Sequence, residues 1–144
     1  MATADEARAA VVAARADLSA ALAGAAGGWN TKPAGGEGEE AWSAQEVAAH
    51  VIPADLFFAR AACKGAGVDG PANPIKGALI TTPQEATAAL QAVAAATDAT
   101  VAAIGAEDMG KDAHESFGTV EGVFGVWAGH IRDHAAQIRA AARS

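Results

Sequence analysis

The sequence has little cysteine, few aromatic residues and few positive charges, and each shortage narrows the possible functions. Cys63 is the only cysteine among 144 residues, so no disulfide can form within the chain. Ten Lys and Arg stand against 17 Asp and Glu, which gives a formal net charge of −7. Nucleic-acid binding needs clustered basic residues that displace counterions from phosphates. DNA and RNA are therefore disfavoured as partners.

Long apolar runs are missing as well. No stretch reaches the roughly 20 residues that a membrane-spanning helix needs, and residues 1–6 have neither the basic region nor the apolar core of a signal peptide. Hydrophobic residues nevertheless make up 51% of the chain, and alanine dominates them, which favours a folded helical protein over a disordered one. We expect one soluble, cytoplasmic domain over residues 1–144, with no membrane contact.

The beginnings of the helices are marked by capping residues. Thr3, Ser43 and Thr82 are each followed three residues later by a glutamate, which is the capping-box pattern. Pro83 suits the first helical position, and Thr119 is a weaker cap. Apolar residues then recur every three or four positions. These signals predict helices over residues 4–24, 44–63, 83–104 and 120–142.

The connection over residues 64–82 is much longer than a turn between antiparallel neighbours requires. Extended at about 3.3 Å per residue, it can return along a helix of about 30 Å. The second and third helices are therefore expected to be parallel. The sequence predicts an all-α four-helix bundle of up-down-down-up order, with a long crossover between helices 2 and 3.

Three histidines are the candidate functional residues. His130 and His134 are four residues apart and share one face of the last helix, while His50 lies on the apolar face of the second helix. The predicted topology brings all three toward one end of the bundle and leaves His114 at the other. Three imidazoles can hold Zn, Ni, Cu or Fe and leave a position open. The pattern equally allows histidines that never meet.

Two polar neighbours of these histidines are less informative. Gln137, three residues after His134, either hydrogen-bonds a water on the metal ion or is simply solvated. Asp55 follows His50 by five residues and falls off its helical face, so we assign it no role in a site. No Ser-His-Asp set, catalytic carboxylate pair or dinucleotide-binding motif is evident, and catalytic residues remain unassigned.

Two segments resemble the DinB-like superfamily of four-helix bundles. Residues 42–50, which run from Trp42 and Ser43 to His50, are similar to the opening of the family's second helix. Residues 130–138 are similar to its fourth-helix motif. The resemblance implies a bundle that is often a homodimer and that binds a divalent ion, such as Zn or Ni, through His50, His130 and His134. Fe is a further possibility. Some members are similar to transferases or isomerases that use the low-molecular-weight thiols mycothiol or bacillithiol.

Three hypotheses about function follow. The first is a metal-dependent enzyme acting on a small molecule, such as a transferase that uses a low-molecular-weight thiol, or a hydrolase. The second is a protein that binds a metal ion and a ligand without turnover. The third is a structural dimeric bundle in which the histidines are incidental. Metal content that depends on His134 would favour the first two hypotheses over the third. Panels of thiols and electrophiles would separate the first two, because thermal stabilisation without product favours a binding protein.

Overall fold

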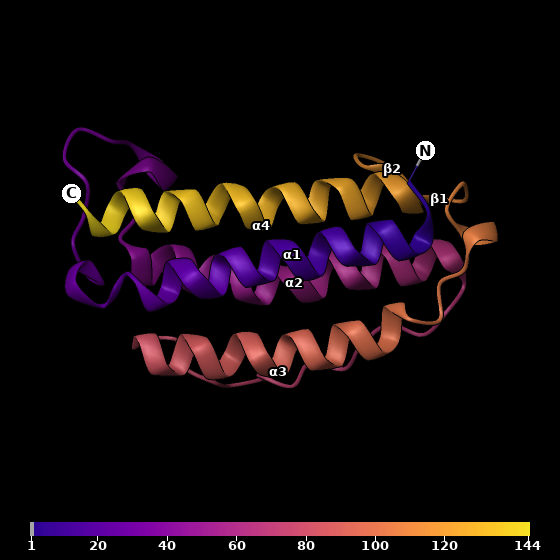
Figure 1. Cartoon of the computed structure of the whole chain (residues 1–144), viewed down its shortest axis with the longest axis horizontal. Helices are drawn as coiled ribbons and strands as arrows, with labels where there is room; N and C mark the ends of the chain where they lie inside the picture. Colours follow the sequence, from indigo (N-terminus) through magenta and orange to yellow (C-terminus); the bar gives the residue numbers. More distant parts are fainter. Residues whose placement is uncertain (1) are drawn as a thin grey trace.

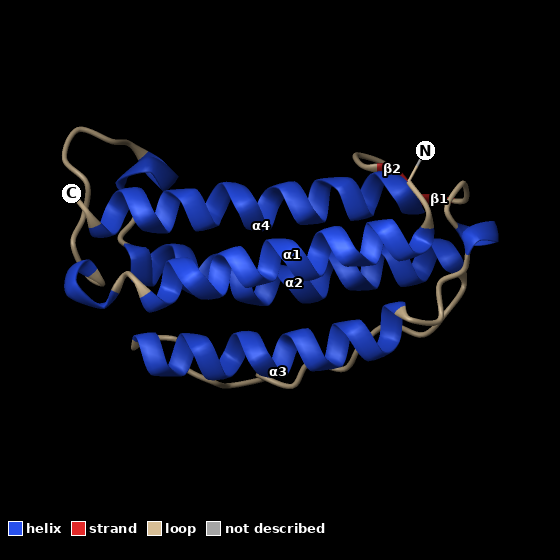
Figure 2. Cartoon of the chain, viewed as in Figure 1, coloured by secondary structure: helices blue, strands red, loops and turns tan. Residues whose placement is uncertain are grey.

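The computed structural model describes residues 2–144, and within them four long helices form the bundle (Figure 1). The helices are α1 (Ala4–Ala23), α2 (Ala44–Ala66), α3 (Pro83–Val101) and α4 (Val120–Ala142). Single-turn 3-10 helices, η1 (Ala26–Gly28), η2 (Gly38–Ala41) and η3 (Ala106–Asp108), lie in the connections, and β1 (Asp112–His114) pairs antiparallel with β2 (Gly118–Thr119) (Figure 2). The predicted all-α fold class is confirmed.

The predicted helix starts are confirmed by their caps. The hydroxyl of Thr3 accepts from the Glu6 amide, and the Glu6 carboxylate accepts from the Thr3 amide. The same reciprocal pairs form at the starts of α2 and α3, whereas Thr119 caps α4 without a box. Each reciprocal pair satisfies two backbone donors that a helix start would otherwise leave free.

Two helix ends differ from the prediction by three residues each, and α1 ends one residue early, at Ala23. Helix α2 continues three residues further than expected and stops at Gly67, whose φ of 77° lets its amide bond back to the carbonyls of Cys63 and Lys64. Helix α3 ends three residues early, at Val101. Ile104 is still buried, because a tight turn returns its amide to the Val101 carbonyl. The apolar spacing therefore continued past the end of the helix.

The order of the helices is up-down-down-up, as predicted. Helices α1 and α4 run in one direction, and α2 and α3 run in the other (Figure 1). The crossover over residues 67–82 returns along the bundle beside α3, and α4 packs against both α1 and α2. The start of α2 and the end of α4 consequently lie at the same end of the bundle, next to the loop over residues 24–43. Within residues 2–144, none of the helices combines the length and the apolar character needed to span a bilayer.

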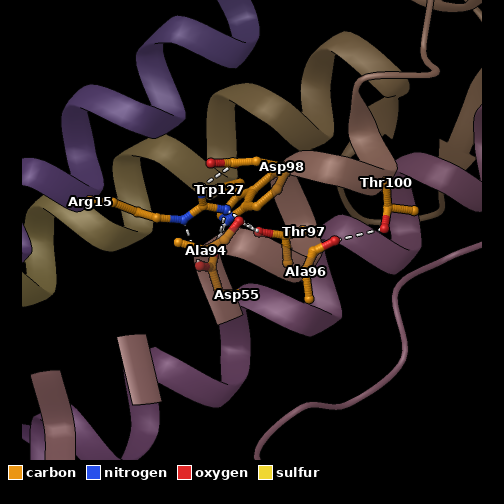
Figure 3. Close-up of polar contacts among 8 residues, drawn as sticks. All are labelled: Arg15, Asp55, Ala94, Ala96, Thr97, Asp98, Thr100 and Trp127. Carbon is orange, nitrogen blue, oxygen red and sulfur yellow. Dashed lines mark hydrogen bonds and ion pairs between the residues drawn. The ribbon is translucent and has the colours of Figure 1, made fainter. Parts of the chain in front are cut away.

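The core is mostly aliphatic, but a buried polar cluster crosses it (Figure 3). The Arg15 side chain donates from Nε to Asp55 Oδ2 at 2.7 Å and also hydrogen-bonds Thr97 and Asp98. The indole of Trp127 donates to the other oxygen of Asp55. Burial raises the pKa of the Asp55 carboxyl, and the Arg15 charge partly offsets that rise. The cluster joins α1, α2, α3 and α4, so Asp55 has a structural role that the sequence analysis did not assign.

Candidate metal centre

Three histidines from two helices come together near one end of the bundle. One nitrogen from each of His50, His130 and His134 lies within 4.8 Å of the other two. The Nε2 atoms of His130 and His134 are 3.2 Å apart. The ring of His50 lies 5.4 Å from that of His130 and 4.9 Å from that of His134, between centroids. The predicted convergence of these side chains is therefore confirmed.

The antiparallel pairing of α2 and α4 explains the convergence. His50 is six residues beyond the start of α2, and His134 is eight residues before the end of α4, so each lies about two turns from the shared end of the bundle. His130 is one turn further along α4 on the same face. His134 is buried, whereas His50 and His130 are half-buried. The cluster is thus set into the bundle rather than spread over its surface.

A chain of hydrogen bonds orients the His134 ring. The backbone carbonyl of Glu39 can only accept a hydrogen bond, so the side-chain nitrogen of Gln137 must be the atom that faces it. The side-chain oxygen of Gln137, Oε1, therefore faces the His134 ring. This oxygen lies 2.7 Å from His134 Nδ1 and must accept a hydrogen bond from the N–H at that position. The Nε2 of His134 is left with its lone pair directed at His130. Gln137 therefore orients the His134 ring.

The His130 ring is left with an unsatisfied polar atom. Its Nδ1 is buried and has no hydrogen-bond partner among the described residues. Desolvation and the charges of His134 and His50 lower the pKa of His130 from 6.5 to about 4. Desolvation, together with the charge of His134, also lowers the pKa of His50. Both rings are therefore neutral near pH 7, which is the form that binds metal ions.

The donor set fits a metal ion. Zinc–nitrogen distances of about 2.0–2.1 Å place tetrahedral ligand nitrogens about 3.3 Å apart, close to the 3.2 Å between the two Nε2 atoms on α4. Without a cation, the lone pair of His134 Nε2 needs a proton from His130 Nε2, and His130 Nδ1 then keeps a bare, buried lone pair. A cation between the rings removes this conflict. The Gln137 contact supplies the outer hydrogen bond that metal-bound histidines usually make.

Aromatic side chains wall the cluster on two sides. The ring of Trp42 lies 5.3 Å from that of His50, and the ring of Phe58 lies 5.1 Å from that of His130. The carboxylate of Glu39 lies close enough to raise the pKa values of both half-buried histidines slightly against the larger lowering effects. The site therefore combines neutral nitrogen donors, an apolar wall and one nearby negative charge.

Other titratable candidates lie away from this cluster. His114 is in β1 at the opposite end of the bundle and stacks on Phe117 with 4.4 Å between ring centroids, as the topology predicted. Cys63 is fully buried, and burial raises the pKa of its thiol, so it has none of the features of a reactive thiolate.

Comparison with known families bears on the same residues. The sequence model of the DinB superfamily matches residues 10–138, which include all three clustered histidines. The chain belongs to the DinB superfamily. No curated protein and no solved structure gives a significant match to it. The predicted family is thus confirmed, and a group of three histidines that could hold a metal ion lies within the matched region of this DinB-superfamily chain.

Proposed function

We propose that this DinB-superfamily protein binds one divalent metal ion through His50, His130 and His134 and uses it in a reaction on a small molecule. The observation that carries the proposal is the meeting of three imidazoles, with Gln137 hydrogen-bonded to Nδ1 of His134 so that its Nε2 faces His130. Zinc or nickel is the proposed ion, with iron as the alternative, because nitrogen donors suit all three.

An ion coordinated by three histidine nitrogens keeps at least one coordination position open for water or substrate. When bound, the ion would lower the pKa of a thiol or water in that position. On this basis the proposed activity is transfer of a group to or from a low-molecular-weight thiol. The residues of the chain have separate parts in it. The histidines would hold the ion, Gln137 would keep His134 in the tautomer that binds it, and Trp42 and Phe58 would exclude water on two sides.

Metal content is the first test. Protein purified gently and supplemented with zinc or nickel should carry close to one ion per chain, and His134→Ala should lose it. His114→Ala is the matched control, because it removes the one imidazole outside the cluster. Trace metal in the unaltered protein, or equal metal in the His134→Ala variant, would overturn the proposed site.

Turnover is the second test. The metal-loaded protein is incubated with a thiol and an electrophilic acceptor, and formation of the thioether is followed. Thermal stabilisation by the thiol without product would favour a binding protein over an enzyme. The homodimer implied by the family resemblance stays a prediction, and light scattering at several protein concentrations would measure it directly.

A further inference from the structure

A groove of about 520 Å³ lies between α2 and strand β1, on the side of α2 that also faces the crossover. Its wall on α2 is formed at spacings of three and four residues, which include Phe57, Arg60 and Lys64, and His114 contributes from β1. The volume falls within the range of about 300–1,000 Å³ that is usual for small-molecule sites.

The α2 wall of the groove carries an exposed aromatic ring, that of Phe57. Phe57 is 46% exposed in a protein whose other phenylalanines are at least partly buried. Its position is nonetheless defined, because its ring meets those of Phe58, His114 and Phe117 at centroid distances of 5.4, 5.8 and 6.2 Å. Leaving a supported aromatic ring open to water forgoes the free energy of burial, and such patches commonly mark binding surfaces.

The same α2 wall is also positively charged, next to the Phe57 ring. Arg60 and Lys64 are one turn apart on α2, and both are exposed. Neither forms an ion pair with any residue in the described part of the chain, residues 2–144, and no carboxylate lines the groove there. The Nε of Arg60 donates to the Pro71 carbonyl at 3.1 Å, which holds the guanidinium against the crossover. In a chain of net charge −7, Arg60 and Lys64 form a local concentration of positive charge that favours an anion.

We infer that this groove binds a small planar organic anion, of the aromatic carboxylate class, with its ring on Phe57 and its carboxylate between Arg60 and Lys64. The Phe57 ring and the two cations together favour a ligand that is both aromatic and anionic. An inorganic anion would leave the Phe57 surface uncovered, and a neutral aromatic molecule would leave both cations unpaired. Two basic residues in an acidic protein are too few for a nucleic acid.

The groove is separate from the three-histidine cluster but close to it. Phe57 is seven residues beyond His50 on α2, which is about 10 Å along the helix axis. Phe58, which contacts the Phe57 ring, also packs on His130. The inferred binding uses no histidine of the cluster, so it can be tested independently of the proposed metal site.

The test uses 2-naphthoate as the probe and isothermal titration calorimetry on the full chain. Saturable binding with one site is expected. Lys64→Gln and Phe57→Ala should each weaken it about tenfold, which is the loss expected for one charge-assisted hydrogen bond or one aromatic contact. Arg143→Gln is the matched control, since it removes an exposed positive charge at the far end of α4 and should leave the affinity unchanged. The neutral analogue 2-naphthamide should bind at least about tenfold more weakly.

Several outcomes would overturn the inference. The inference is overturned if 2-naphthoate shows no saturable binding up to about 5 mM, a concentration at which a site of even modest affinity would fill. Equal affinity for the amide shows that the cations do not take part, and unchanged affinity in the Phe57→Ala variant places the probe elsewhere. Loss of binding in His134→Ala protein would mean that the carboxylate coordinates the metal ion instead. Melting curves of the Lys64 and Phe57 variants establish that both fold, which is expected because both side chains are exposed.

Discussion

Removing the Asp55 carboxylate should destabilise the protein far more than removing a surface carboxylate. Arg15 and Asp55 are only 5% and 2% exposed, so Asp55→Ala leaves a guanidinium inside the bundle without its main partner. Breaking a buried pair in this way typically costs about 3–5 kcal/mol. The indole N–H of Trp127 also loses its acceptor, which adds about 1–3 kcal/mol if water cannot replace it.

The two costs are not fully additive, because Asp98 remains beside Arg15. The Asp98 side chain is 45% exposed and therefore offers a weaker, partly screened partner. We expect a loss of about 3–5 kcal/mol in the free energy of unfolding, which corresponds to a fall of about 10–15 °C in Tm for a domain of this size. Asp55→Asn keeps an oxygen acceptor, so its stability should lie between that of the unaltered protein and that of the Asp55→Ala variant.

The measurement is urea unfolding followed by circular dichroism, with Asp17→Ala as the matched control. The Asp17–Arg139 pair has the same 2.7 Å contact, but its side chains are 40% and 36% exposed, and its removal should cost about 0–1 kcal/mol. The double variant Arg15→Met/Asp55→Leu should be more stable than Asp55→Ala, because it removes the unpaired charge. The reasoning is refuted if Asp55→Ala costs no more than Asp17→Ala.

Two further predictions concern the histidine cluster. In protein freed of metal, stability should fall as the pH drops from about 6.5 to about 4, because burial lowers the pKa of His130 to about 4 and the unfolded chain then binds more protons than the folded one. His130→Gln should flatten this slope in urea midpoints measured across the window, and an unchanged slope would contradict the assignment. Gln137→Leu should weaken zinc affinity about 10- to 100-fold while all three histidines remain, since it frees the His134 tautomer. Competition with a chromogenic chelator measures the affinity, and an unaltered value would assign Gln137 no part in orienting the ring.

The features that the sequence predicted well are those determined by short-range patterns. The capping boxes at Thr3, Ser43 and Thr82 set three helix starts through contacts only three residues apart. The convergence of the histidines needed one more premise, the up-down-down-up order. That order followed from the length of the second connection, because a chain long enough to return along a helix permits parallel neighbours.

The features that were missed depend on contacts between distant segments. The carbonyl that orients Gln137 belongs to Glu39, 98 residues earlier in a loop, and nothing in either segment marks the pair. The Arg15–Asp55 pair could have been suspected from the sequence pattern. Arg15 lies four residues after Val11 and three before Leu18, on the buried stripe of α1, and a charged residue at such a position requires a buried partner. The groove beside Phe57 could not be predicted, because its second wall is a hairpin in a connection that the pattern defined only as a loop.

Two members of the buried polar cluster, Asp55 and Trp127, lie on the two helices that carry the histidine cluster, and this should couple the two clusters. Asp55 follows His50 by five residues on α2, and Trp127 precedes His130 by three on α4, so the indole–carboxylate bond joins the helices about one turn from the imidazoles. Nitrogens on two helices can hold one ion only if the helices keep their spacing and register. Trp127→Phe retains the ring but deletes this bond, and it should therefore weaken zinc affinity, although residue 127 contributes no ligand. Thr97→Val is the control, because it removes only the contact of α3 residue Thr97 with Arg15 in the buried polar cluster. It should change the stability of the protein with little effect on zinc affinity. Equal zinc affinities in the two variants would show that the spacing of α2 and α4 at the site is set by general packing and not by this bond.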